Sequence, residues 1–246
     1  MSEINKKAWS YRAYEWRETT SGSPEETAKD MKRDPHHYVR RHIDYMGDVA
    51  GKKIAVLLGS SGHKAIPLAI LGAQVTVVDI SLENAKYALQ TAKEADVEID
   101  FIVSDLFELN MDELRNTFDM VYLEGGILHY FADLNSFANI VFERLSEGGR
   151  LVLNDFHPFR KIIKIREDDS FVVEGDYFDM ELLYGEVAYK SFFLDSEQGD
   201  FPPCLLRYWN LGEIISAIAG CGLVIEKLVE EPRYDQHKNL PGNFTL

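Results

Sequence analysis

The sequence predicts an α/β fold in which a doubly wound, mostly parallel sheet of seven strands carries helices on both faces. Two observations predict it. From Gly51 to Asp155, short apolar runs alternate with amphipathic stretches, which is typical of βαβ units around a parallel sheet. Two further apolar runs follow near the C-terminus and complete the count of strands. Right-handed crossovers then place the helices on both faces.

Residues 1–50 are predicted to form an N-terminal helical cap. Aromatic residues gather near the start, at Trp9, Tyr11, Tyr14 and Trp16. Residues 23–26 read Ser-Pro-Glu-Glu, a capping box with proline at the first helical position, so a helix should begin there. Pro35 interrupts this helix on its way to Met46 and predicts a break near Asp34.

Apolar runs and turn residues place the elements of the sheet. The expected strands are Lys53–Leu58, Gln74–Asp79, Ile99–Val103, Met120–Leu123 and Arg150–Asn154. The expected helices between them are His63–Leu71, Leu82–Ala95 and Leu134–Leu145, the last closed by a turn at Gly148 and Gly149.

Regular alternation stops after Asp155. Residues 159–207 mix charged residues with β-rich runs such as SFVVEG and EVAYKSFFL, which predicts an inserted hairpin or lid. A helix over Leu211–Cys221, a strand over Leu223–Glu230 and a short strand over Asn243–Leu246 should follow. With 46% hydrophobic residues, the chain can bury one principal core, so residues 51–246 are expected to form a single domain.

The net charge is −15, from 26 Lys and Arg against 41 Asp and Glu. Such a charge disfavours nucleic-acid and membrane partners, and we interpret the basic stretch Lys32–Arg41 as a solvated helix face. Cys204 and Cys221 lack metal-ligand spacing, so no metal site is expected. Because no signal-peptide pattern or membrane-length apolar run is present, we expect a cytoplasmic protein.

The first strand leads into the turn Gly59, Ser60, Ser61 and Gly62. Residues this small let backbone N–H groups approach a ligand closely, although an ordinary tight connection would look the same. The second strand ends at Asp79, where a carboxylate can accept both hydroxyls of a ribose.

The third strand leads to a second acid, Asp105, at the same edge of the sheet. Its carboxylate or a neighbouring N–H can read the amino edge of an adenine, while Ile80 and Leu106 offer apolar faces to the ring. A small-residue turn and two acids at three successive strand ends therefore predict a nucleoside ligand.

With these features the sequence resembles the class I S-adenosylmethionine-dependent methyltransferases, in particular their small-molecule branch. The resemblance is strongest over Gly51–Asp155 and extends loosely through residues 207–232 and 241–246. It implies a Rossmann-like sheet with an antiparallel last strand. It also implies S-adenosylmethionine as cofactor, S-adenosylhomocysteine as product, and in-line methyl transfer to a small-molecule acceptor.

The resemblance implies roles for individual residues. The turn at 59–62 would bind the methionine part of the cofactor, and Asp79 would bind the ribose. Ile80 and Ser81, which follow Asp79, are also expected to contact the cofactor. Asp105 and Leu106 would bind the adenine. Two residues after the fourth strand would lie beside the methionine part, namely Glu124 and Gly125.

One departure from the family pattern bears on function. The family usually has an acid in the first strand and three spaced glycines, where this chain has Val56, Leu58, Ser60 and Gly62. The missing acid removes a usual contact to the cofactor's amino group, so a binding protein without turnover is one alternative. A NAD-dependent oxidoreductase is another, although GSSGHKA does not fit GxGxxG.

Methyl transfer requires alignment, exclusion of water and, for some acceptors, removal of a proton. His157, after the fifth strand, is the first candidate for a general base, and His129, after the fourth strand, is the second. Either could instead be a hydrogen-bonded loop residue. Four aromatic residues are expected to line the acceptor pocket beneath the N-terminal segment and the insertion, although the first two could simply fill a core: Tyr14, Trp16, Tyr208 and Trp209.

Overall fold

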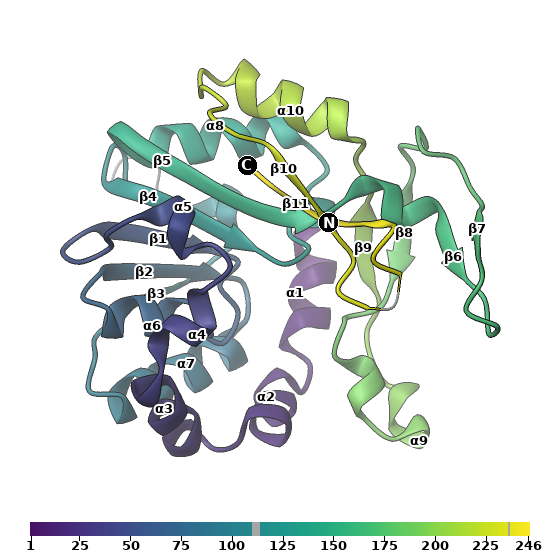
Figure 1. Cartoon of the computed structure of the whole chain (residues 1–246). Coiled ribbons are helices and arrows are strands. Elements are labelled where there is room, and N and C mark those ends of the chain that lie inside the picture. Colours follow the sequence, from purple (N-terminus) through teal and green to yellow (C-terminus); the bar gives the residue numbers. More distant parts are fainter. Residues whose placement is uncertain (110–113, 236) are drawn as a thin grey trace.

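The computed structural model describes residues 1–109, 114–235 and 237–246. Within them, seven strands form one sheet in the order β10-β11-β5-β4-β1-β2-β3, which confirms the predicted α/β fold (Figure 1). The strands are β1 (Lys53–Leu57), β2 (Gln74–Asp79), β3 (Asp100–Val103), β4 (Phe118–Glu124), β5 (Leu145–Phe156), β10 (Val229–Pro232) and β11 (Pro241–Thr245).

The sheet is parallel at its centre and antiparallel at one side. Strands β3, β2, β1, β4 and β5 run parallel, and β11 pairs antiparallel with both β5 and β10. The antiparallel last strand is therefore confirmed. Since the chain moves outward from β1 through β2 to β3 and then returns to β4, the strand order reverses beside β1, where open α/β sheets bind their ligands.

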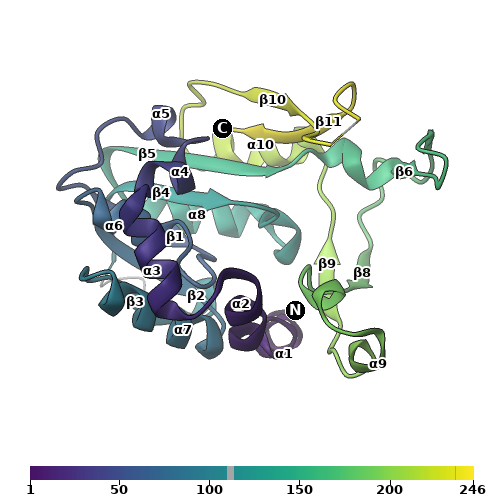
Figure 2. The ribbon, with the colours of Figure 1, turned by 60° about the horizontal axis from the view of Figure 1, so that its bottom comes forward.

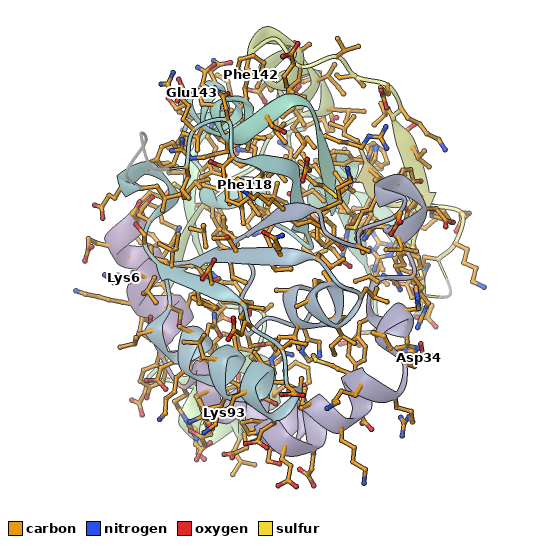
Figure 3. The ribbon with its side chains drawn as sticks, turned by 90° about the vertical axis from the view of Figure 1, so that its left-hand side faces the viewer. Lys6, Asp34, Lys93, Phe118, Phe142 and Glu143 are labelled. Carbon is orange, nitrogen blue, oxygen red and sulfur yellow. The ribbon has the colours of Figure 1, made fainter. Side chains whose placement is uncertain are left out.

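Helices cover both faces of the sheet, as Figure 2 shows from a second direction. The helices between or after the strands are α6 (Ala65–Ile70), α7 (Leu82–Glu94), α8 (Leu134–Arg144) and α10 (Leu211–Gly220). One large apolar core lies between the sheet and α8 with α10, and a second lies between the sheet and α6 with residues 39–49. In Figure 3, Phe118 lies inside, while Lys6, Asp34 and Lys93 lie at the surface.

The N-terminal segment is helical: α1 (Ser2–Ser10), α2 (Ala13–Ser21), α3 (Pro24–Arg33), α4 (Pro35–Val39) and α5 (Ile43–Met46). The predicted capping box is present, because the Ser23 hydroxyl accepts from the Glu26 N–H and the Glu26 carboxylate accepts from the Ser23 N–H. The predicted break at Asp34 is also confirmed, since its side chain caps α4.

The insertion after β5 contains two hairpins rather than one. Strands β6 (Ile163–Ile165) and β7 (Phe171–Val173) form the first, and β8 (Leu182–Gly185) and β9 (Cys204–Arg207) form the second. The run EVAYKSFFL was expected to be β-rich but contains a 3-10 turn, because residues 186–194 have no strand partner. The remaining short helices are η1 (Leu106–Glu108), η2 (Leu128–Tyr130), η3 (Pro158–Ile162), η4 (Lys190–Phe192) and α9 (Asp195–Gln198).

Two other expected boundaries are wrong. The strand expected over Leu223–Glu230 begins only at Val229. Leu223 and Ile225 are partly buried against the core while Val224 is 85% exposed, so the alternation reflects packing of an extended chain without a strand partner. The expected turn at Gly148 and Gly149 lies inside β5, which already begins at Leu145.

Candidate functional site

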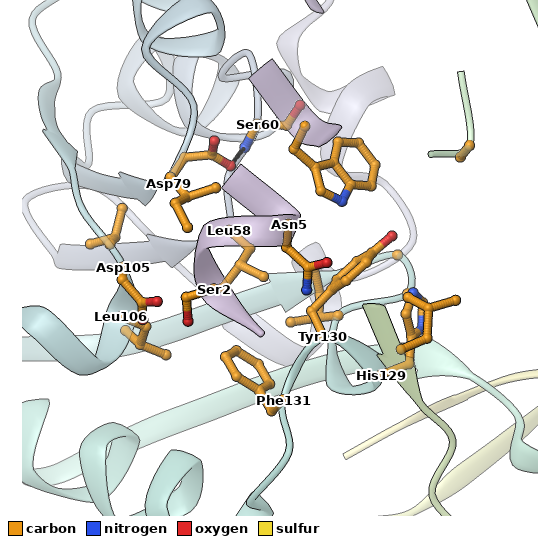
Figure 4. A pocket seen from close by; sticks show the side chains of 18 of the residues that line it. Ser2, Asn5, Leu58, Ser60, Asp79, Asp105, Leu106, His129, Tyr130 and Phe131 are labelled. Carbon is orange, nitrogen blue, oxygen red and sulfur yellow. Dashed lines mark hydrogen bonds between the residues drawn. The ribbon is translucent and has the colours of Figure 1, made fainter. Parts of the chain in front are cut away.

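The carboxyl ends of the central strands open into one cavity of about 440 Å³ (Figure 4). Ser60 after β1, Asp79 at the end of β2, Asp105 after β3 and Glu124 at the end of β4 all line it. The opposite wall comes from α1 and from β9, so residues far apart in the sequence close the space over the sheet edge.

The turn after β1 has an unusual backbone. Leu58 and Ser60 have φ values of 50° and 48°, in the left-handed region that favours glycine. Gly59 lies against β2, and a Cβ there would lie 2.7 Å from Cγ1 of Val77. Of the predicted turn residues, Ser60 lines the cavity, whereas Gly59, Ser61 and Gly62 support the turn from behind.

Asp79 is only 7% exposed and holds the turn in place. Its Oδ2 accepts from the Ser60 N–H at 2.9 Å, and its Oδ1 accepts from the Ser81 N–H at 2.9 Å and from the Asn84 amide at 3.2 Å. Burial raises the pKa of Asp79, and these three hydrogen bonds oppose that rise. The carboxylate is thus fixed at the cavity wall. Ser81 does not line the cavity; it caps α7.

The predicted adenine-binding residues lie together beside Asp79. Ile80, Asp105 and Leu106 all line the cavity, and Phe107 adds an aromatic side chain that the sequence reasoning missed. The Oδ1 atom of Asp105 accepts from the Phe107 N–H at 2.8 Å, so the carboxylate caps η1. This part of the cavity combines apolar side chains with one oriented acid.

Glu124 belongs to a buried polar network. Its Oε2 accepts from the Tyr122 hydroxyl at 2.5 Å and lies 3.0 Å from Nζ of Lys64 and 3.6 Å from Nδ1 of His42. Burial would raise the pKa of Glu124, but the nearby His42 imidazole, the charge of Lys64 and the Tyr122 hydroxyl outweigh it and lower the pKa to about 2. An ionised carboxylate therefore faces the cavity beside Gly125, which also lines it.

His129 lies in the cavity on the short helix η2. Its ring packs beside Tyr130, with centroids 4.2 Å apart, and parallel to the ring of Phe156 at 6.3 Å. Burial lowers the pKa of His129 to about 4, so the imidazole is neutral at pH 7. The loop before it is fixed by Asp155, whose carboxylate accepts from the N–H groups of Ile127 and Leu128 at 2.9 and 2.7 Å.

His157 lies outside this cavity and is only 7% exposed. Its Nδ1 accepts from the Phe159 N–H at 3.1 Å, and its Nε2 lies 2.6 Å from a carboxylate oxygen of Glu230. Both ring nitrogens are engaged, and His157 caps η3. It borders a second, smaller cavity instead.

The four predicted acceptor-binding aromatic residues separate in the structure. Trp16 and Tyr208 line the cavity at the carboxyl ends of the strands. Trp209 donates its indole N–H to the Leu128 carbonyl at 3.0 Å and lines the second cavity, and Tyr14 bonds Gln90 on α7 at 2.6 Å. Sequence position alone could not separate these pairs, because their elements meet only in the fold.

The N-terminal helices and the second hairpin of the insertion share an apolar cluster above the cavity. The Asn5 side chain accepts from the Leu205 N–H at 2.7 Å and donates to the Leu205 carbonyl at 3.0 Å, which joins α1 to β9. Trp16 stacks on Tyr189, with centroids 4.7 Å apart. The sequence reasoning missed Asn5, because a single polar residue gives no sign of a partner 200 positions away.

Comparisons with known proteins point to a methyltransferase domain. A family model described as a methyltransferase domain matches residues 57–153. A ubiquinone biosynthesis O-methyltransferase from Xanthomonas oryzae pv. oryzae is 26% identical over 158 residues, which is 63% of this chain and 63% of that protein. The chain thus spans less than two thirds of the length of the curated relatives it matches.

Solved structures are similar in fold at low identity. An S-adenosylmethionine-dependent methyltransferase from Mesorhizobium loti has a TM-score of 0.62 and 20% identity, over 83% of this chain and 94% of that one. Magnesium protoporphyrin IX methyltransferase from Synechocystis PCC 6803, solved with bound S-adenosylhomocysteine, has a TM-score of 0.57 and 16% identity, over 99% and 97%. These likenesses establish the fold.

Across residues 1–109, 114–235 and 237–246, no helix is both long and apolar enough to cross a membrane. The same ranges contain no group of three His, Cys, Asp or Glu side chains placed to hold a metal ion.

Proposed function

We propose that this chain, which carries a class I S-adenosylmethionine-dependent methyltransferase domain, transfers a methyl group to a small-molecule acceptor in the cavity at the sheet edge. One observation carries the proposal. Four successive strand ends, at Ser60, Asp79, Asp105 and Glu124, line a single cavity at the point where the strand order reverses.

The residues present fit the cofactor. Asp79 is held at the cavity wall, where its carboxylate would accept the ribose hydroxyls, and Ile80, Asp105 and Leu106 would enclose the adenine. Glu124 is ionised and faces the same space, so it would pair with the amino group of the methionine part. That role would offset the acid missing from β1.

The bound cofactor supplies an electrophilic methyl group, so the protein's own work is alignment, exclusion of water and removal of a proton. For an acceptor that must lose a proton, we propose His129 rather than His157 as the general base. His129 is neutral and lines the cavity, whereas both nitrogens of His157 are engaged elsewhere. Trp16 and Tyr208 would cover the acceptor.

A small acceptor is favoured because side chains of α1 and of the insertion close the cavity from above. The net charge of −15 disfavours a nucleic acid, and the matched O-methyltransferases support a small molecule. Both cysteines are free, which suits the cytoplasmic location that we propose.

Thermal denaturation with S-adenosylhomocysteine or NADH tests the cofactor. Because a ligand that binds only the folded state raises the melting temperature, S-adenosylhomocysteine should raise it and NADH should not. The reverse result would favour the oxidoreductase. Methyl transfer from labelled S-adenosylmethionine to a panel of phenols, carboxylic acids and amines then tests turnover. Cofactor binding without transfer to any member of the panel would favour the binding protein.

A further inference from the structure

A second cavity of about 290 Å³ adjoins the cavity proposed to bind the cofactor. The two share the side chains of His129, Phe156 and Tyr208. Phe156 is 42% exposed although it is a large apolar residue between two cavities. These three side chains lie between the two cavities, and an acceptor that extends past Phe156 would contact both.

Arg160 and Lys161 are adjacent residues of η3, and both line the second cavity. The segment between β5 and β6 that contains η3 can be followed in Figure 1. Within the described ranges neither Arg160 nor Lys161 forms an ion pair. The Arg160 guanidinium lies 4.3 Å from the centroid of the Phe156 ring, and Nζ of Lys161 lies 3.4 Å from the Asp179 carbonyl oxygen. Burial lowers the pKa of both side chains, so their charges are costly without an anion.

The acids around this cavity are already engaged. Asp155, which lines it, accepts three backbone N–H groups, from Ile127, Leu128 and Phe156. Glu230 is bonded to His157 at 2.6 Å. Two arginines nearby have carboxylate partners of their own, in the pairs Arg207 with Glu213 and Arg233 with Asp235. Asp176 and Asp179, which act on Lys161 from beyond ion-pair distance, accept the N–H groups of Phe178 and Glu181. In a chain of net charge −15, this cavity thus presents two cations that form no ion pair in the described structure.

We infer that the methyl acceptor carries an anionic group, a carboxylate or a phosphate, which binds Arg160 and Lys161 while the accepting atom lies at His129. The inference rests on the proposed function and extends it to a class of substrate. Arginine and lysine are the side chains that bind such oxyanions by charge-assisted hydrogen bonds. His129 borders both cavities. The accepting atom would lie at this ring, and the anionic group of the same molecule would lie in the second cavity.

Calorimetric titrations of the full chain saturated with S-adenosylhomocysteine test this inference. The probes are 3,4-dihydroxybenzoate and its uncharged analogue 3,4-dihydroxybenzamide, which have nearly the same shape. Phenyl phosphate, compared with phenol, tests the phosphate arm. At least one anion should bind about tenfold or more tightly than its neutral partner.

The variant Arg160→Gln with Lys161→Gln should lose this preference and keep the parent's affinity for S-adenosylhomocysteine. Lys164→Gln, on the exposed hairpin β6–β7 and outside both cavities, is the matched control and should keep the preference. Arg160→Lys should retain part of it if the double variant is unstable. Equal binding of anion and neutral analogue, an unchanged preference in the double variant, or no binding of any probe overturns the inference. Failure to bind S-adenosylhomocysteine instead overturns the proposed function.

Discussion

At the scale of single residues, the turn after β1 has left-handed backbone at two positions that are not glycine, although Gly59 and Gly62 remain in it. Leu58 and Ser60 occupy left-handed conformations, which cost roughly 1–2 kcal/mol each for residues with a Cβ. These are two of the positions where the resembling family has glycine. The sequence therefore located the turn correctly, and its loss of glycine is compensated by the Asp79 carboxylate that accepts the Ser60 N–H.

Asp79→Asn is expected to weaken the binding of S-adenosylhomocysteine. Replacing the carboxylate removes a charge-assisted acceptor for the ribose hydroxyls, which is worth about 1.5–3 kcal/mol, or roughly ten- to hundredfold in affinity. Calorimetry measures the change. Asp100→Asn, at the exposed first residue of β3, is the control and should bind as the parent does. An unchanged affinity in a folded Asp79→Asn protein would remove Asp79 from the proposed site.

His129→Gln is expected to lower turnover by about 10²–10⁴-fold on an acceptor that must lose a proton, with little change in cofactor affinity. The pH profile adds a second test. Because burial depresses the pKa of His129 to about 4, the imidazole stays neutral as the pH falls from 8 toward 5. Loss of turnover through this base should therefore begin only as the pH approaches 4.

His157→Gln is the comparison variant for that experiment and should turn over at a near-parent rate. A large loss in His157→Gln with none in His129→Gln would reverse the assignment. Sequence analysis placed His157 first and His129 second, but it could not separate them by geometry, because both histidines follow strands that end at the same sheet edge. It could not foresee that Glu230 and the Phe159 N–H engage both nitrogens of the His157 ring.

At the scale of elements, local sequence patterns predict the parallel centre of the sheet. They do not predict the cover of the cavity, by which we mean α1 and the second hairpin of the insertion. Strands β1 to β4 are short apolar runs with clear turn signals, so their positions were predicted to within a few residues. The cover joins α1 to β9, whose residues are about 200 positions apart. Long-range pairing of this kind leaves no periodic signal, and for the same reason the start of β10 was misplaced.

Asn5→Ala is expected to loosen this cover. The Asn5 amide makes two hydrogen bonds to Leu205, and removing both should cost about 1–3 kcal/mol of local stability. Hydrogen exchange should quicken over residues 2–21 and 186–207 and stay unchanged in β1 and β2. The exposed neighbour Glu3→Gln is the control. Equal exchange in the parent and in Asn5→Ala would show that the apolar cluster alone holds α1.

At the scale of the whole molecule, charge and topology have separate consequences. The net charge of −15 disfavours nucleic-acid and membrane partners, yet η3 places the adjacent residues Arg160 and Lys161 at one cavity, where neither forms an ion pair in the described structure. An overall charge cannot reveal such local concentration, because neighbouring acids are engaged by backbone N–H groups and by His157. The topology of the sheet was easier to predict than the local charge, since βαβ order and right-handed crossovers determine which strand ends meet.

A crystal structure of the full chain with S-adenosylhomocysteine tests the central claim most directly. The account predicts the ribose on Asp79, the adenine beside Asp105 and Leu106, the amino group at Glu124, and the sulfur facing the space lined by His129 and Tyr208. S-adenosylhomocysteine bound elsewhere, or with its ribose away from Asp79 and its sulfur turned from His129, would contradict the account.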